Sequence, residues 1–347
     1  MKYSRVYIEA LGYELAPDVV TSDELEERLA PLYTSKRMSV GQLQALTGIR
    51  ERRWWDEGYT LTEGATAAAQ YALNQSKVEP EDIGTFIYAG VNRENFEPAT
   101  ACHVASALGI KGNTHIYDIS NACLGVLNGI FDIANQIELG QIRAGMVVSC
   151  ETAREINDIM IQRMLEDTSI EFFSTAMATL TGGSGAAAVL LTDGSFDAKD
   201  AHRLLGGVSL SAPEHHGLCF WGLAPESGQD VRQLMYTDAV NVLKYGVHLG
   251  ADTWNALCAE LDWTSASVDK VICHQVGKAN REIILNTIGV PEEKDFSTFE
   301  YLGNIGTVSV PLTAALADER GFLEPGDTVA FLGIGSGLNC MMLGLEW

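Results

Sequence analysis

The segment "LTGGSGAAAVLL", residues 180–191, returns in altered form as "LGIGSGLNCMML" at residues 332–343. In both passages turn-forming glycines lead straight into an apolar run of the kind that forms a buried strand. Their central serines, Ser184 and Ser336, lie 152 residues apart. Two similar passages at this spacing indicate two α/β halves of about 150 residues each, with an origin in duplication.

Strand-like and helix-like segments alternate along the rest of the chain, as two α/β halves require. Helical spacing is clearest at residues 61–75, 98–108 and 122–139. We place the N-terminal half at residues 1–192 and the C-terminal half at 193–347, because the polar passage "TDGSFDAKDAHR" (192–203) begins there. Residues 152–180 form an extra helical insertion whose Ile, Met and Phe residues are either a cavity wall or simple core.

Composition narrows the class of protein. The 347 residues are 46% hydrophobic and 20% charged, which is typical of a packed α/β enzyme. A net charge of −23 without a basic stripe argues against a nucleic-acid partner. We expect no membrane span and no signal peptide. The seven cysteines form no CxxC pair and no zinc-type spacing, so we expect no metal, reduced thiols and a cytoplasmic location.

Cys123 is the candidate nucleophile. In "YDISNACLGVLNGI" (117–130) an extended run stops at Ser120, and helical spacing starts at once, with the cysteine in the first turn. A helix N-terminus favours the thiolate. The 152-residue offset carries Cys123 onto Gln275, beside His274, and so predicts that the cysteine and a proton acceptor occupy equivalent strand-to-helix corners. The plainer alternative is a buried, space-filling cysteine.

Two further polar groups are candidates for holding a carbonyl oxygen. The backbone N–H groups of Cys123 and Ser336, the latter in "GIGSG" (333–337), can form an oxyanion hole. Asn304 lies between glycines before a helical segment, and its amide is either a donor to a thioester carbonyl or only an Asx-turn. Only ten residues follow Gly337, too few for a dinucleotide-binding unit.

Four motifs occur in one order along the chain: "NACLG" (121–125), "CHQVG" (273–277), "LGNIG" (302–306) and "GIGSGLN" (333–339). With "LTGIRERRWW" (46–55), they resemble the thiolase superfamily, in the branch of the β-ketoacyl-ACP synthase III enzymes. The resemblance implies a five-layered αβαβα thiolase fold of two duplicated halves, a homodimer, and Cys123, His274 and Asn304 as catalytic residues. The positively charged candidates for binding the anionic coenzyme A are Arg50, Arg53 and Lys278. The alternative for the two arginines is that they simply lie in a solvent-exposed turn.

Within that branch, "EPATA" (97–101), "NACL" and "GIGSGLNC" resemble the OleA enzymes, which join two long-chain acyl-CoAs in bacterial olefin biosynthesis. The resemblance implies that Glu97, with Pro98 at the first position of a helix, reaches the partner subunit's site as a base. Such a base has a chemical reason, because condensing two ordinary acyl thioesters requires removal of an α-proton. We therefore expect long-chain acyl-CoA as substrate, coenzyme A as leaving group and no cofactor, with downstream enzymes of the pathway as candidate partners.

Three alternatives compete with this hypothesis. A decarboxylating synthase using malonyl-ACP is disfavoured because the usual "HQAN" is "HQVG" here, the usual Arg before "TGI" is Leu46, and such an enzyme has no use for Glu97. A non-catalytic chain-length subunit would lack the nucleophile. A Cys/His thioesterase or amidase leaves the duplicated halves and the Asn304 motif unexplained.

Overall fold

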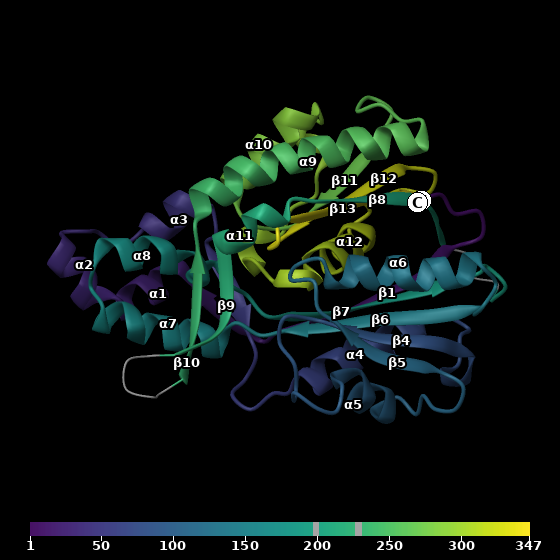
Figure 1. Cartoon of the computed structure of the whole chain (residues 1–347), viewed down its shortest axis with the longest axis horizontal. Coiled ribbons are helices and arrows are strands. Elements are labelled where there is room, and N and C mark those ends of the chain that lie inside the picture. Colours follow the sequence, from purple (N-terminus) through teal and green to yellow (C-terminus); the bar gives the residue numbers. More distant parts are fainter. Residues whose placement is uncertain (197–200, 226–230) are drawn as a thin grey trace.

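The computed structural model describes residues 1–196, 201–225 and 231–347, and its main feature is a mixed sheet through the whole molecule (Figure 1). The strands in sheet order are β11 (Lys270–Cys273), β12 (Thr328–Gly335), β13 (Asn339–Glu346), β8 (His202–Ser211), β1 (Tyr7–Leu15), β7 (Gly185–Thr192), β6 (Ala144–Glu151), β4 (Ile83–Ala89) and β5 (His115–Ile119). Strands β1 and β8 pair only at Tyr7–Arg203 and Ile8–His202. The sheet therefore consists of two parts that meet along a short seam.

The two parts have the same connectivity. In the first, β4 is parallel to β5 and β6, and β6, β7 and β1 follow antiparallel to one another. In the second, β11 is parallel to β12, and β12, β13 and β8 follow antiparallel. The counterpart of β5 is reduced to one parallel bridge between Val271 and Asp295. This repeated topology confirms the predicted α/β class with a duplicated unit.

Helices cover both outer faces and fill the space between the two parts of the sheet (Figure 1). Helices α4 (Leu61–Asn74) and α5 (Thr100–Ala107) cover one outer face, α9 (Ala239–Leu261) and α10 (Lys278–Ile288) cover the other, and α6 (Gly125–Glu138) and α12 (Ser309–Glu319) lie in the middle. The central helices are apolar on most sides, which suits burial between two sheets. Leu127 and Ile130 of α6 and Val310 of α12 share one core cluster with Val189 and Phe331 of the strands. The layers therefore run αβαβα, as predicted.

A smaller lobe lies to one side of these layers, at the left of Figure 1. It contains α1 (Ser22–Arg28), α2 (Ala30–Lys36), α3 (Gln42–Thr47), α7 (Arg154–Glu166), α8 (Ile170–Ala176), the 3₁₀-helix η2 (Met177–Thr181), the pair β2 (Asp18–Thr21) and β3 (Glu51–Trp54), and the hairpin β9 (Cys219–Pro225) and β10 (Val231–Thr237). The remaining short elements of the described chain are η1 (Pro80–Asp82), η3 (Pro213–Leu218), η4 (Glu292–Lys294), α11 (Phe299–Leu302) and η5 (Gly306–Val308). The lobe has its own apolar core, which includes Leu25, Leu43, Ile156 and Phe173. None of the helices within the described ranges combines the length and apolar composition that crossing a bilayer requires.

The predicted equivalence of Cys123 and His274 is wrong. Cys123 follows β5, the third strand of its half, whereas His274 follows β11, the counterpart of the second strand, β4. The topological counterpart of the Cys123 turn is the segment before α12, which contains Asn304. The offset of 152 residues relates β7 to β13 but fails upstream, because α7, α8 and η2 are inserted between β6 and β7.

Two predicted helix starts also shift, and the division between the halves stays a prediction. Helix α6 begins at Gly125, so Cys123 lies in the turn before it rather than within its first turn. Helix α5 begins at Thr100, so Pro98 is not its first residue. Within the polar passage chosen as the start of the second half, residues 197–200 lie outside the described residues.

Candidate active site

A cavity of about 390 Å³ opens where the two halves and the smaller lobe meet. Cys123, Asn304 and Ser336 line it, and these three predicted site residues come from both halves of the chain. The walls are largely apolar and include Ile156 and Ala178 of the insertion and Phe220, Trp221 and Met235 of the β9–β10 hairpin. A nucleophile and two polar groups thus face a space suited to an apolar ligand.

The turn that carries Cys123 has an unusual backbone. Ala122 has a φ of 44°, in the left-handed region that non-glycine residues rarely adopt. Hydrogen bonds hold the turn: Leu124 N–H donates to the Asn121 carbonyl (2.9 Å), and the Asn339 amide donates to Asn121 Oδ1 (3.1 Å). Because Asn339 belongs to β13, the C-terminal half supports the conformation that directs Cys123 toward the cavity.

Burial sets the protonation of the cysteine and the histidine. Burial and, to a smaller extent, the nearby Glu151 carboxylate together raise the pKa of Cys123 to about 12. Burial lowers the pKa of His274 to about 4. Loss of solvation therefore opposes the expected thiolate, because it acts against any effect of the helix end. Burial thus favours a neutral thiol and a neutral imidazole.

His274 lies directly after β11, beside the end of β12. Its backbone N–H donates to the Leu332 carbonyl (2.8 Å). The end of β12 also reaches the nucleophile's turn, since a Cβ on Gly335 would lie 3.4 Å from the Cys123 nitrogen. His274 is not among the described residues that line the cavity, and its Nδ1 is buried with no hydrogen-bond partner in the described parts of the chain. The end of β12 thus adjoins both predicted catalytic residues.

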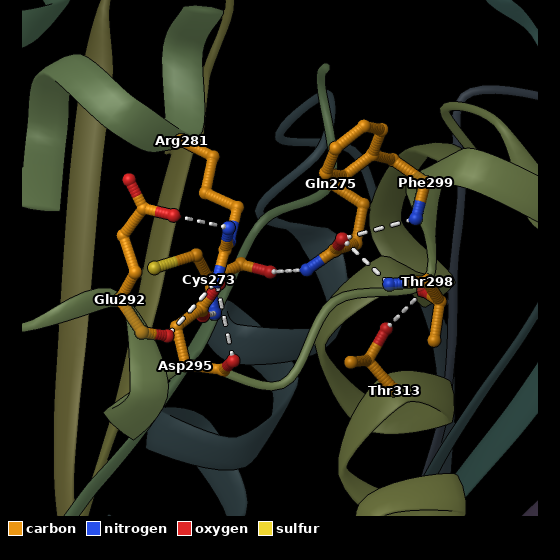
Figure 2. Close-up of polar contacts among 8 residues, drawn as sticks. All are labelled: Cys273, Gln275, Arg281, Glu292, Asp295, Thr298, Phe299 and Thr313. Carbon is orange, nitrogen blue, oxygen red and sulfur yellow. Dashed lines mark hydrogen bonds and ion pairs between the residues drawn. The ribbon is translucent and has the colours of Figure 1, made fainter. Parts of the chain in front are cut away.

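A polar network holds the segment around His274 (Figure 2). The buried Gln275 amide donates to the Cys273 carbonyl (2.6 Å) and accepts from the N–H groups of Thr298 (3.0 Å) and Phe299 (3.2 Å). On the other side, Asp295 accepts from Arg281 Nε (2.5 Å) and from the Cys273 N–H (3.4 Å). These bonds fix the backbone on both sides of His274 and tie it to the segment that leads to Asn304.

Asn304 forms the Asx-turn that its sequence context allowed, and its role as a donor to a thioester carbonyl stays a prediction. Its backbone pairs with the insertion, donating to the Thr181 carbonyl (2.8 Å) and accepting from Gly183 N–H (2.9 Å). Its side-chain oxygen accepts from Gly306 N–H (3.1 Å), which is the Asx-turn. The same bond leaves the two amide N–H groups as the donors at the cavity wall.

The predicted substrate-binding residues lie apart from these groups. Arg50 and Lys278 are exposed, and Lys278 packs against Gly48, two residues from Arg50. Arg53 instead donates to the Ala16 carbonyl (3.3 Å), and its neighbour Arg52 is buried. Arg50 and Lys278 are thus the predicted cationic groups that lie near each other on the surface.

Glu97 lies on an exposed segment before α5 and is not among the described residues that line its own chain's cavity. Its neighbour Phe96 is 97% exposed. The role of Glu97 in a partner subunit stays a prediction.

Sequence reasoning missed the buried carboxyl of Glu151, which lines the cavity at the end of β6. Burial raises its pKa to about 7. One signal was available: "AGMVVSCE" (144–151) is a largely apolar strand that ends on a charged residue, at the end of the sheet where the other site residues lie. The β9–β10 hairpin was missed as well, because its cavity role depends on how it folds over the insertion.

Comparison with known proteins agrees with this fold and site. Residues 57–171 match the sequence family "Thiolase, N-terminal domain", and residues 258–347 match "3-Oxoacyl-[acyl-carrier-protein (ACP)] synthase III C terminal". The structure superposes on Xanthomonas campestris OleA with a TM-score of 0.93 at 35% identity, covering 100% of this chain and 98% of that one. Another OleA structure, with lauric acid and lauroyl-CoA bound, gives 0.92 and covers 99% and 100% of the two chains.

Fold and site together define a condensing enzyme of the thiolase superfamily, an acyltransferase. The sequence is 58% identical to the acyl-CoA:acyl-CoA alkyltransferase of Shewanella oneidensis and 35% identical to that of X. campestris, covering 100% of each chain. The chain belongs to the acyl-CoA:acyl-CoA alkyltransferase (OleA) family. A β-ketoacyl-ACP synthase III of Natranaerobius thermophilus is more distant, at 27% identity over 99% of this chain and 100% of its own.

Proposed function

We propose that this enzyme joins two long-chain fatty acyl-CoAs head to head, by a non-decarboxylative Claisen condensation, into a 2-alkyl-3-ketoacyl-CoA. The observation that carries the proposal is the cavity itself, where Cys123 and Asn304 face apolar walls. Relatives that carry the name acyl-CoA:acyl-CoA alkyltransferase, and an OleA structure holding lauroyl-CoA, support the substrate class.

The first half-reaction transfers an acyl group to Cys123. Its sulfur attacks the thioester carbonyl of the first acyl-CoA, the thiol proton passes through His274 to the leaving sulfur, and coenzyme A departs as a thiol. The backbone N–H groups of Cys123 and Ser336 hold the oxyanion, and each such donor is worth roughly 3–4 kcal/mol in known cases. A neutral His274, with its pKa lowered by burial, is in the state needed to accept the proton.

The second half-reaction forms the carbon–carbon bond. The second acyl-CoA places its carbonyl oxygen against His274 and the Asn304 amide, and Glu97 of the partner subunit removes its α-proton. The carbanion attacks the acyl-cysteine, the carbon–sulfur bond breaks, and the proton taken up by Glu97 returns to the site as the Cys123 thiol re-forms. The steps use only nucleophilic and acid–base chemistry, so the proposed reaction needs no metal or redox cofactor.

The cellular setting follows from the same hypothesis. The enzyme acts as a homodimer, because each site takes Glu97 from the other subunit. It works in the cytoplasm, where cysteines stay reduced, which agrees with the seven free cysteines of the chain. Its product suits downstream enzymes of long-chain olefin biosynthesis, which are the candidate partners for a larger assembly. Arg50, Arg53 and Lys278 supply positive charge to coenzyme A.

The runner-up function is decarboxylating synthesis from acyl-CoA and malonyl-ACP. The proposed function and the runner-up differ in the source of the carbanion. The test therefore supplies purified enzyme with myristoyl-CoA alone and follows the products by mass spectrometry. We expect one 2-alkyl-3-ketoacyl-CoA for two acyl-CoAs consumed, and no product from Cys123→Ala. Product that forms only after malonyl-ACP is added would establish the runner-up instead.

A further inference from the structure

The carboxyl of Glu151 lies between two loops that the second half-reaction needs. Glu151 is 4% exposed, and it lines the cavity that also contains Cys123 and Asn304. We infer that Glu151 is a positioning residue for the condensation step, holding the loop that leads to Glu97 and the loop of Asn304 against the nucleophile's turn. This inference rests on the proposed function and adds a residue to which that mechanism gives no role.

The first loop leaves β4 and runs to Glu97. Glu151 Oε1 accepts from Val91 N–H (3.2 Å), and Oε2 accepts from the Asn92 amide (3.2 Å). The same Asn92 amide donates to the Thr152 carbonyl (3.2 Å). Beyond this point the chain becomes exposed, so the contacts with Glu151 and Thr152 anchor the projecting segment where it leaves the sheet.

The second loop runs from Asn304 to α12. The backbone N–H of Thr307 lies close enough to the Glu151 carboxyl to lower its pKa. Gly306 packs on that carboxyl so closely that a Cβ there would lie 3.3 Å from its carbon and oxygen atoms, and its φ of 58° also favours glycine. Because Gly306 N–H donates to Asn304 Oδ1, the placement of Gly306 sets the direction of the Asn304 amide.

The second loop also reaches the nucleophile's helix. Thr307 Oγ1 accepts from the backbone N–H of Val126 (2.8 Å), one of the free donors in the first turn of α6. Glu151, Thr307 and Val126 therefore form a continuous path from β6 to the helix that follows Cys123. A shift of Glu151 would move the Asn304 loop relative to the acyl-cysteine.

The charge of the carboxyl gives a measurable signature. The titratable groups facing it are Cys123, Cys150 and Tyr88, and its negative charge raises the pKa of all three. Replacing the carboxylate by an amide removes that charge, which favours ionisation of the Cys123 thiol. A residue that served only to fill space would leave the thiol's reactivity unchanged.

The test separates acylation from condensation in Glu151→Gln, with Glu155→Gln as the control. Glu155 lies four residues along, exposed on α7, so it undergoes the same chemical change outside the cavity. With myristoyl-CoA we expect Glu151→Gln to give a Cys123 acylation burst close to that of the wild type. Its product formation should fall about 100-fold, the scale of loss when reacting groups are displaced by about 1 Å. Alkylation of its Cys123 by iodoacetamide at pH 8.5 should be faster than in the wild type.

A second variant, Glu151→Asp, separates geometry from charge. It keeps the charge but is one methylene too short to hold both loops, so product formation should fall while Cys123 alkylation stays slow. Unchanged condensation in either variant would overturn the inference. So would equal losses of acylation and condensation in both variants. The wild type is assayed first with myristoyl-CoA alone, so a failure of the proposed function appears there, whereas a failure of this inference appears only in the variants.

Discussion

Desolvation and the neighbouring Glu151 carboxylate favour the protonated form of the Cys123 thiol, because they raise its pKa to about 12. His274 is neutral because burial lowers its pKa to about 4. A neutral thiol reacts slowly with alkylating agents, because the thiolate is the reactive form.

This protonation state predicts the pH dependence of labelling. Iodoacetamide reacts with thiolates, so the labelling rate of Cys123 should keep rising through pH 9 and 10 without a plateau. The exposed Cys102 provides an internal comparison and should label faster at pH 8. Peptide mass spectrometry of protein sampled over a pH series resolves the two sites. A Cys123 plateau below pH 9 would mean that the resting enzyme holds a thiolate after all.

The insertion and the hairpin set the shape of the cavity at the scale of secondary-structure elements. Ala178 of η2 lies on the wall, and its side chain is small. Ala178→Phe should therefore narrow the cavity, lowering acylation by myristoyl-CoA by at least tenfold while leaving acylation by butyryl-CoA near the wild-type level. Ser174→Phe, on the exposed face of α8, adds similar bulk outside the cavity and serves as the control. Equal acylation of Ala178→Phe by both substrates would place the acyl chain elsewhere.

The order of elements was predictable from the sequence, but their correspondence between the halves was not. Glycine-rich turns and apolar runs marked β7 and β13, and helical spacing marked α4 and α6. The offset between Ser184 and Ser336 was misleading upstream, because an insertion between β6 and β7 changes the spacing without changing the topology. Asn304, rather than His274, is the topological counterpart of the Cys123 turn.

Local chemistry was harder to predict than residue identity. Cys123, Asn304 and Ser336 do share a cavity, as their motifs indicated. The thiol's protonation depends on burial, which a helix-terminus argument does not include. Glu151 carries no motif, and its importance appears only when Val91, Asn92 and Thr307 are seen to converge on one carboxyl.

At the scale of the whole molecule, the proposed site is complete only in a dimer. Mixing Cys123→Ala chains with Glu97→Ala chains should restore activity, because one site of each heterodimer regains both groups. With random exchange, half the chains enter heterodimers and one site of each is intact, so we expect about a quarter of wild-type activity. Product assays after subunit exchange, confirmed by native mass spectrometry, make the measurement. No recovery would place Glu97 in its own chain's site or outside the mechanism.

The most direct test of the central claim, that a carboxylate creates the carbanion, compares Glu97→Gln with wild type using myristoyl-CoA alone. A rapid-quench experiment follows acylation of Cys123 and then product formation. We expect Glu97→Gln to acylate at the wild-type rate and then to lose product formation by about 10²–10⁴-fold, the usual cost of removing a positioned base. Full condensation by Glu97→Gln would contradict the account.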